Sequence, residues 1–343
     1  MAKSPSNINP NYKRKPIPEY SKNECLEGIA NGNTKLLSYV ISKAESYHAN
    51  DQQFVRDIII ELKPNTNVRK LAISGSPGVG KSTFINSFGA HLIRNKKKIA
   101  ILPVDPSSHI SHGSILGDKT RMEDLVNLDG AYIKPMASAL ALGGLAPSTA
   151  VASMLCERSH FDYIIMETVG VGQSEYEARH LVDMFILLLQ PGGGDDLQGI
   201  KRGIMEMADM MIITKADGSL LSNAEFSFKA YKNAMKLMLP NSYNWSPEVF
   251  IYSSLTGDGN DDVLEGIENY YKFMTKDDSL LKLRHKQSQY HFNKEYKNLM
   301  LSQLLQKKDF KLLIDELQAQ LSSKEIIPLQ ALNILRKKLE ELL

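Results

Sequence analysis

The sequence predicts an α/β fold built around a mostly parallel sheet that helices cover on both faces. Short apolar runs alternate with helical segments between residues 70 and 271, as in parallel sheets that are buried on both sides. A glycine-rich loop directly follows the first of these runs, and apolar residues outside the region recur at helical spacings. The expected strands are residues 71–74, 99–104, 163–166, 184–189, 210–213 and 249–252.

Composition narrows the class of protein. The 343 residues carry 41 basic and 39 acidic side chains, and the net charge of +2 gives no long-range field that favours nucleic acid or a membrane surface. No apolar run reaches the roughly 18 residues that a membrane span needs. Cys25 and Cys156 are too few for a disulfide framework, which favours a reducing cytoplasm. We therefore expect a cytoplasmic protein without nucleic-acid or membrane partners.

Periodicity divides the chain into four parts. Residues 1–21 are expected to be a disordered tail, because four prolines interrupt a basic stretch that otherwise resembles a transit peptide. Residues 22–65 form an N-terminal helical segment, and residues 66–275 form the sheet domain. Residues 276–343 form a C-terminal helical arm, in which Pro328 separates two helical parts. The apolar stripe of this arm must pack against the chain's own sheet or a second subunit, and we favour a homodimer contact.

The glycine-rich loop after the first expected strand matches a phosphate-binding pattern. Its residues read G-S-P-G-V-G-K-S, which fits G-x-x-x-x-G-K-[ST]. The glycines let backbone N–H groups converge on phosphates at a helix start, Lys81 adds a positive charge, and the Ser82 hydroxyl suits Mg²⁺. The sequence therefore predicts a nucleoside triphosphate site formed by Gly75, Ser76, Pro77, Gly78, Val79, Gly80, Lys81, Ser82 and Thr83.

A second motif indicates guanine as the base. Thr214, Lys215 and Asp217 directly follow the expected strand at residues 210–213. A carboxylate at Asp217 accepts hydrogen bonds from N1 and the exocyclic N2 of guanine, a donor pair that adenine lacks. The Lys215 stem covers the plane of the base. After the next strand, the backbone N–H groups of Ser253, Ser254 and Leu255 are candidates for the guanine O6 atom.

Carboxylates and glycines at other strand ends complete the predicted site. Asp105 and Glu167 each end an expected strand, so both should lie near Ser82 and suit Mg²⁺. Gly170 and Gly172 place a backbone N–H near a γ-phosphate and permit movement when that phosphate leaves. The glycine-rich stretch at residues 190–201 is expected to be another flexible loop.

With these residues in place, the chain resembles the MeaB/ArgK family of P-loop GTPases, the methylmalonyl-CoA mutase-associated chaperones. The resemblance runs from about Lys22 onward and is densest from Gly75 to Asp217. It includes V-D-P-S-S at residues 104–108, G-S-I-L-G-D-K-T-R-M at residues 113–122 and E-T-V-G-V-G-Q-S-E at residues 167–175. These strings are far more specific than a phosphate loop, and they imply a P-loop GTPase domain at residues 66–275.

The resemblance implies roles that no spacing reveals. Ser82, Asp105, Asp118 and Glu167 are expected around Mg²⁺, with Asp118 in the first switch and Gln173 in the second. The segment ending in Gln198 and Lys201 is expected to be a third switch that touches the partner. Family members are homodimers whose GTP hydrolysis gates delivery of adenosylcobalamin to methylmalonyl-CoA mutase or a related cobalamin-dependent mutase, which they also protect.

One position departs from the family pattern, because Thr214 stands where the family usually has Asn. A Thr hydroxyl is shorter than an Asn amide and makes fewer hydrogen bonds between the base and the phosphate loop. We expect Asp217 to preserve selectivity for guanine, with weaker nucleotide affinity.

The expected reaction is hydrolysis of GTP to GDP and phosphate. Lys81 and Mg²⁺ stabilise the phosphate oxygens while the segment from Glu167 to Gln173 holds the attacking water, so the catalytic candidates are Lys81, Glu167 and Gln173. The main alternative is a kinase that transfers the γ-phosphate to a protein or small molecule. A metal-delivery GTPase would need a Cys- or His-rich cluster, which His109 and His112 do not supply. A binding module without catalysis is the remaining alternative.

Overall fold

The computed structural model describes residues 18–46, 48–105, 122–137, 147–168, 170, 173–192, 202–237 and 239–342. The chain forms two compact units, Met1–Asp277 and Asp278–Leu343. The first unit contains the sheet and every described residue of the predicted nucleotide site.

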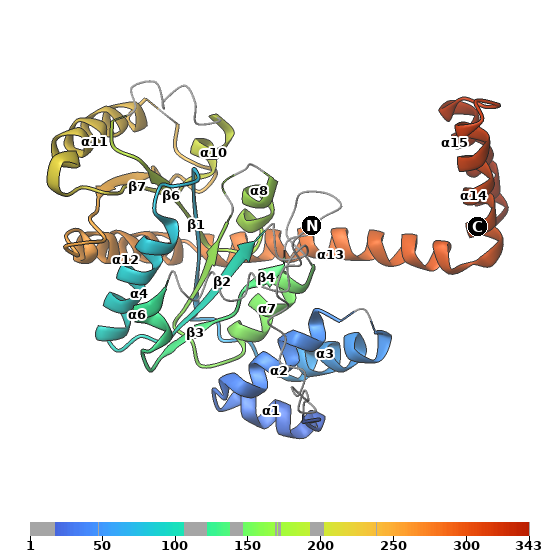
Figure 1. Ribbon diagram of the computed structural model, residues 1–343, viewed down its shortest axis with the longest axis horizontal. Helices are drawn as coiled ribbons and strands as arrows, with labels where there is room; N and C mark the ends of the chain where they lie inside the picture. The colour runs from blue at the N-terminus through green and yellow to red at the C-terminus, as the bar shows by residue number, and fades with distance from the viewer. Residues whose placement is uncertain are drawn as a thin grey trace, which may run out of the picture. The chain divides into compact units, whose positions relative to one another are not determined.

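A parallel sheet forms the centre of the first unit (Figure 1). Its strand order is β3-β2-β5-β1-β6-β7-β8, with the short β4 paired to β2, and every pairing is parallel. The strand that ends in the glycine-rich loop, β1, lies between β5 and β6. The strands are β1 (Arg69–Gly75), β2 (Ile99–Asp105), β3 (Ala131–Ile133), β4 (Met136–Ala137), β5 (Tyr163–Glu167), β6 (Met184–Leu189), β7 (Met210–Ile213) and β8 (Glu248–Ile251).

All six strands expected from the sequence are present, and the predicted α/β fold is confirmed. Two further strands, β3 and β4, were not predicted, because runs of three and two residues give no recognisable alternation. The first strand also begins earlier than expected, at Arg69 and Lys70. These charged side chains pair with Glu268 and Glu157, which lie far away in the sequence.

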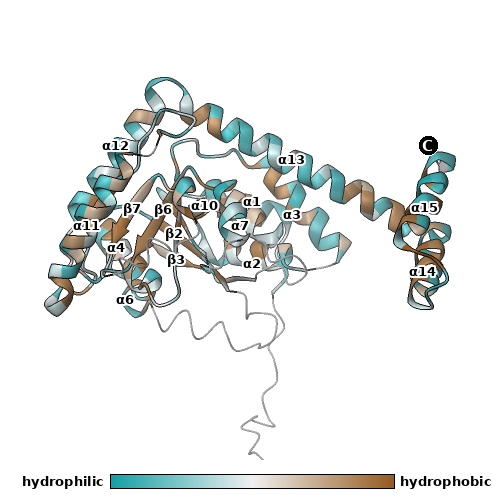
Figure 2. Ribbon diagram, turned by 90° about the horizontal axis from the view of Figure 1, so that it is seen from above, coloured by the Kyte–Doolittle hydropathy of each residue, from teal (hydrophilic) through white to brown (hydrophobic). Residues whose placement is uncertain are grey.

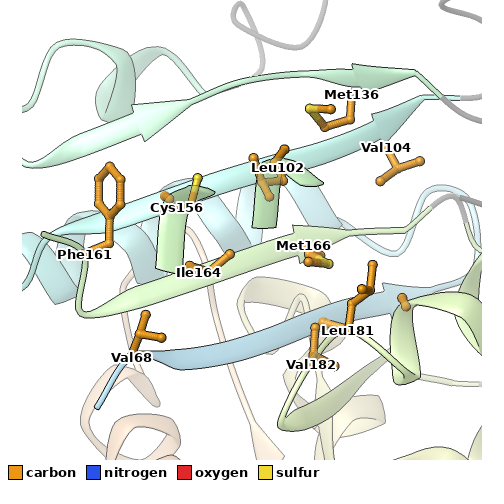
Figure 3. Close-up of a cluster of buried hydrophobic side chains, with 14 of the residues drawn as sticks. Val68, Leu102, Val104, Met136, Cys156, Phe161, Ile164, Met166, Leu181 and Val182 are labelled. Atoms are coloured by element: carbon orange, nitrogen blue, oxygen red, sulfur yellow. The ribbon is translucent and has the colours of Figure 1, made fainter. Parts of the chain in front are cut away.

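Helices cover both faces of the sheet. One face packs against α2, α7 and α11 in a continuous core, to which β2 contributes Leu102 and β5 contributes Ile164 and Met166 (Figure 3). Helices α4 and α12 cover the other face, where Gly266 of α12 lies against Phe250 and Met210. The described helices of this unit are α1 (Lys22–Ala30), α2 (Thr34–Ala44), α3 (Ala49–Glu61), α4 (Lys81–Arg94), α6 (Glu123–Val126), α7 (Pro147–Glu157), α8 (Gln173–Arg179), α10 (Arg202–Met207), α11 (Leu221–Met235) and α12 (Asn260–Lys276), with a 3₁₀ turn at Gly218–Leu220.

The hydropathy of the elements follows this layering. The strands are strongly apolar, and the helices that flank them carry polar residues on part of their surface (Figure 2). The strand β6 is buried along its whole length, as expected for a strand covered on both faces.

Local signals also determine where two helices begin. Ser21 and Glu24 form a capping box at the start of α1, and the Asn33 side chain caps α2.

The second unit is helical, as expected. It contains α13 (Ser279–Gln306), α14 (Lys308–Ser322) and α15 (Pro328–Leu342). Pro328 is the first residue of α15, a position that tolerates the missing N–H group of proline. Phe310 and Leu317 of α14 and Ala331 of α15 are buried, whereas Leu299 of α13 is more than half exposed. Among the described residues, no helix combines the length and apolar character needed to cross a membrane.

Candidate functional site

The predicted phosphate loop lies between β1, which ends at Gly75, and α4, which begins at Lys81. Gly78 and Gly80 have φ angles of +79° and +100°, a left-handed backbone that glycine adopts without strain. The Val79 N–H donates to the Ser76 carbonyl, which tightens the turn, and Gly80 caps α4. The loop therefore directs backbone N–H groups and the positive end of the α4 dipole to one point, as anion binding requires.

Lys81 turns its amine back over this loop. Its Nζ donates to the carbonyl oxygens of Gly75 and Ser76 at 2.8 and 3.2 Å. Burial lowers the pKa of Lys81, and the nearby carboxylates of Glu167 and Glu175 oppose this shift. The site thus holds a partly desolvated cation beside the loop, where an anionic phosphate gains most from it.

Two of the oxygen groups predicted to bind Mg²⁺ are in contact. The Ser82 hydroxyl donates to Glu167 Oε1 at 2.9 Å, and Glu167 is the last residue of β5. Asp105 is the last residue of the neighbouring β2, and Asp118 lies outside the described residues. A hydroxyl beside a carboxylate is a donor set that fits Mg²⁺. Among the described residues, no cluster of three or more His, Cys, Asp or Glu side chains is placed to hold a metal.

Gly170 lies directly against the start of the phosphate loop. A β-carbon at this position would be 2.2 Å from the Gly75 carbonyl oxygen and 3.3 Å from Lys81 Nζ, and φ is +92°. Only glycine fits this backbone conformation and this contact. The second predicted switch therefore begins within reach of the amine expected to bind the outer phosphates.

The sequence reasoning missed Glu175, which holds Gly170 in place. The Gly170 N–H donates to Glu175 Oε1 at 2.7 Å, and the hydroxyls of Thr168 and Ser174 donate to the two oxygens of the same carboxylate. Glu175 is 0% exposed. The available signal was an acidic residue in the first turn of the helix that follows the glycine-rich segment. Gln173, predicted as catalytic, is the first residue of that helix, α8.

Thr214 and Lys215 join the predicted base-binding segment to the phosphate loop. Thr214 is 2% exposed. Its hydroxyl donates to the Val79 carbonyl oxygen at 2.8 Å and lies 3.2 Å from a second acceptor, the Leu189 carbonyl oxygen. Lys215 Nζ donates to the Gly78 carbonyl oxygen at 2.8 Å. The Lys215 backbone is left-handed, with φ of +56°, a conformation that costs a non-glycine residue energy. Thr214 thus makes the contact with the phosphate loop that the longer Asn was expected to provide.

Asp217 meets the segment that follows β8. The Ser253 hydroxyl donates to Asp217 Oδ2 at 2.6 Å, which fixes the orientation of the carboxylate. The N–H of Ser253, one of the three predicted donors to guanine O6, donates here to the Asp258 carbonyl oxygen, and Leu255 is 81% exposed. Two segments predicted separately to contact guanine, at residues 214–217 and 253–255, are therefore joined by a direct contact. The predicted third switch, with Gln198 and Lys201, lies outside the described residues.

Comparison with known proteins identifies the family. The model of the family described as methylmalonyl-CoA mutase-associated GTPase MeaB matches residues 37–309. The chain belongs to the MeaB family. This MeaB-family protein is therefore a GTPase, as predicted from its phosphate loop and base motif.

Individual relatives extend over most of this MeaB-family chain. It is 38% identical over 295 residues to GTPase ArgK of Escherichia coli K12, covering 86% of this chain and 89% of that protein. It is 42% identical over 243 residues to the mouse protein called methylmalonic aciduria type A homolog, mitochondrial, covering 68% of this chain and 59% of the mouse protein. A crystal structure described as LAO/AO transport system kinase has a TM-score of 0.73 and 29% identity, covering 95% of this chain and all of that one.

Proposed function

We propose that this GTPase is a nucleotide-dependent switch that serves methylmalonyl-CoA mutase or a related cobalamin-dependent mutase. It gates the delivery of adenosylcobalamin and protects the mutase. The name of the family and that of the mouse relative support the mutase as partner. The observation that supports the switch is the contact between Gly170 and Gly75, which places the start of the predicted second switch against the phosphate loop.

We assign the chemistry to groups around the loop. Lys81 neutralises charge on the outer phosphates, and Ser82, Asp105, Asp118 and Glu167 hold Mg²⁺, which would neutralise more of that charge when bound. The segment from Glu167 to Gln173 orients the water, so catalysis is mostly positioning and electrostatic stabilisation. Lys81→Ala is expected to abolish hydrolysis, measured as phosphate release. Normal turnover in this variant would remove the role assigned to Lys81.

We assign guanine recognition to segments that follow β7 and β8, which lie on the other side of β1 from β5 and β2. Asp217 accepts from N1 and N2 of guanine, the Lys215 stem covers the ring, and the N–H groups of Ser254 and Leu255 donate to O6. The contact between Ser253 and Asp217 supports this assignment, because it holds the two segments in register. A competition experiment tests it: ATP is expected to displace labelled GDP far more weakly than GTP does.

The kinase alternative calls for a direct test, since one solved relative carries that description. Labelled γ-phosphate is expected to appear as free phosphate, in the presence and absence of a mutase. Label transferred stoichiometrically to a protein or small molecule would favour the kinase.

The partner and the oligomeric state are tested with the full chain. We propose a cytoplasmic homodimer that uses the helical arm, and the exposed side chain of Leu299 on α13 supports an interface there. Sedimentation should give twice the monomer mass. A purified cobalamin-dependent mutase should be retained on the immobilised protein, and a non-hydrolysable GTP analogue and GDP should give different yields. Equal yields with both nucleotides would contradict a switch.

A further inference from the structure

We propose that Glu175 is a latch that competes with the γ-phosphate for the backbone N–H of Gly170 and thereby sets the preference between GTP and GDP. This inference rests on the nucleotide site proposed above and goes beyond it. It assigns a specificity-determining role to the buried carboxylate of Glu175.

The contacts of Glu175 define the latch. Its Oε1 accepts from the Gly170 N–H at 2.7 Å and from the Thr168 hydroxyl at 3.4 Å, and its Oε2 accepts from the Ser174 hydroxyl at 3.2 Å. The side chain is 0% exposed, so water does not weaken these bonds. An N–H donated to an ionised carboxylate is a charge-assisted hydrogen bond, stronger than one between neutral groups.

The same N–H lies beside the position expected for the γ-phosphate. Gly170 lies close enough to Lys81 for a β-carbon to be 3.3 Å from Nζ. The lysine of such a loop binds the β- and γ-phosphates, so a γ-phosphate beside Nζ is also beside Gly170. A single N–H cannot donate fully to two anionic acceptors, and binding of the third phosphate must therefore release the bond to Glu175.

Electrostatics acts in the same direction. Burial lowers the pKa of the Lys81 amine, and the nearby Glu175 carboxylate partly opposes this shift. The carboxylate therefore also repels a phosphate that Lys81 binds. GDP lacks the third phosphate and does not need the Gly170 N–H, so the latch opposes GTP more than GDP. A ligand shifts such an equilibrium only by its differential affinity for the two states, and here the difference is the γ-phosphate.

Two substitutions separate the hydrogen bond from the charge. Glu175→Gln keeps the shape and an acceptor oxygen but removes the charge. Glu175→Asp keeps the charge but withdraws the carboxylate by one methylene from Gly170. Affinities for GDP and for a non-hydrolysable GTP analogue are measured by calorimetry for both variants and the wild type. The matched control is Glu177→Gln, which also removes a carboxylate from α8. Thermal unfolding checks that each variant folds.

Both Glu175 variants are expected to raise the ratio of GTP-analogue to GDP affinity. The increase should be about five-fold in Glu175→Gln, where the bond to Gly170 changes from charged to neutral. Glu177→Gln is expected to leave the ratio within about two-fold of wild type. An increase in Glu175→Gln alone would show that charge repulsion acts without a latch, and an unchanged ratio in both would overturn the proposal. If the wild type binds neither GDP nor the GTP analogue, the proposed nucleotide site itself is refuted.

A measurement on the unaltered protein covers the case in which the variants do not fold. Labelling valine carbonyls with ¹³C and glycine amides with ¹⁵N selects three Val–Gly amides, those of Gly80, Gly170 and Gly172. A carboxylate-bound N–H resonates far downfield. We expect one such signal to persist with GDP and to move with the GTP analogue. A downfield signal that is unmoved by the analogue, or absent with both nucleotides, would contradict the latch.

Discussion

Gly170 and Gly75 touch through their backbones, since a β-carbon on Gly170 would lie 2.2 Å from the Gly75 carbonyl oxygen. One residue ends the strand that leads into the phosphate loop, and the other begins the segment expected to sense the γ-phosphate. The packing leaves no room for a side chain between them. A shift of either residue towards the other would therefore displace its neighbour.

Gly170→Ala tests this contact. The methyl group must displace the segment, and alanine also resists the left-handed backbone, at a cost of about 1–2 kcal/mol. We expect GTP hydrolysis and affinity for the GTP analogue to fall at least about ten-fold, with GDP affinity changed far less. Gly203→Ala in α10 is the control, because a β-carbon there meets no atom within 4 Å. Equal losses for GTP and GDP in Gly170→Ala would argue for general disruption instead.

The Thr214 hydroxyl is predicted to stabilise the phosphate loop. Thr214→Val keeps the shape but leaves the Val79 carbonyl oxygen without this donor, so the free energy of unfolding should fall by about 1–3 kcal/mol. Thr214→Ser keeps the hydroxyl and should lose much less stability. Chemical denaturation of both variants measures the difference. A loss in Thr214→Val no larger than that in Thr214→Ser would contradict the stabilising role of this hydrogen bond.

Asp217→Asn is predicted to change the preferred base. The amide offers a donor where the carboxylate offers only acceptors, so it no longer matches N2 of guanine but suits the C2 carbonyl of xanthine. GTP affinity should fall by about 100-fold or more, and xanthosine triphosphate should bind better than GTP. Competition against a fluorescent GDP analogue measures both effects. An unchanged preference for GTP would place the guanine elsewhere.

The pair between Arg69 and Glu268 predicts a pH dependence of stability. The Arg69 hydrogen bonds lower the pKa of Glu268 from its usual value of 4.5, and the Tyr163 hydroxyl adds to this effect. The carboxylate therefore stabilises the fold above that value, and its contribution is lost as the pH falls through the lowered pKa.

Glu268→Gln should destabilise the protein at pH 7 by about 1 kcal/mol, a figure that allows for partial exposure of the pair. The difference from wild type should shrink towards pH 3, as the falling pH begins to protonate the wild-type carboxylate. Urea unfolding at both pH values provides the test. Asp261→Asn, at an exposed position on α12, is the comparison variant. A difference that is constant across this range would mean that the charge of Glu268 has no part in it.

The sequence predicts the sheet and the phosphate loop well because each is specified locally. Buried strands such as β6 are unbroken apolar runs, and the spacing of Gly80, Lys81 and Ser82 is a direct requirement of phosphate binding. The hydrogen bond from Gly170 to Glu175 was not predicted, because it depends on how α8 is oriented after the segment that precedes it. Strand β3 was not predicted because its three residues are too few to form a recognisable pattern. It forms by pairing with the edge of β2.

The strand order sorts the proposed contacts onto two flanks of β1. Strands β5 and β2, which lead to Glu167, Gly170 and Asp105, lie on one side, and β6, β7 and β8, which lead to Thr214, Asp217 and Ser253, lie on the other. In the proposed cycle, cleavage of the terminal phosphate is expected to alter the β2 and β5 side of the sheet, and the segments expected to contact the base lie on the other side of β1. A partner that docks along β2 and β5 would contact the segments expected to respond to loss of the γ-phosphate, whereas the predicted third switch follows β6 on the other side of β1.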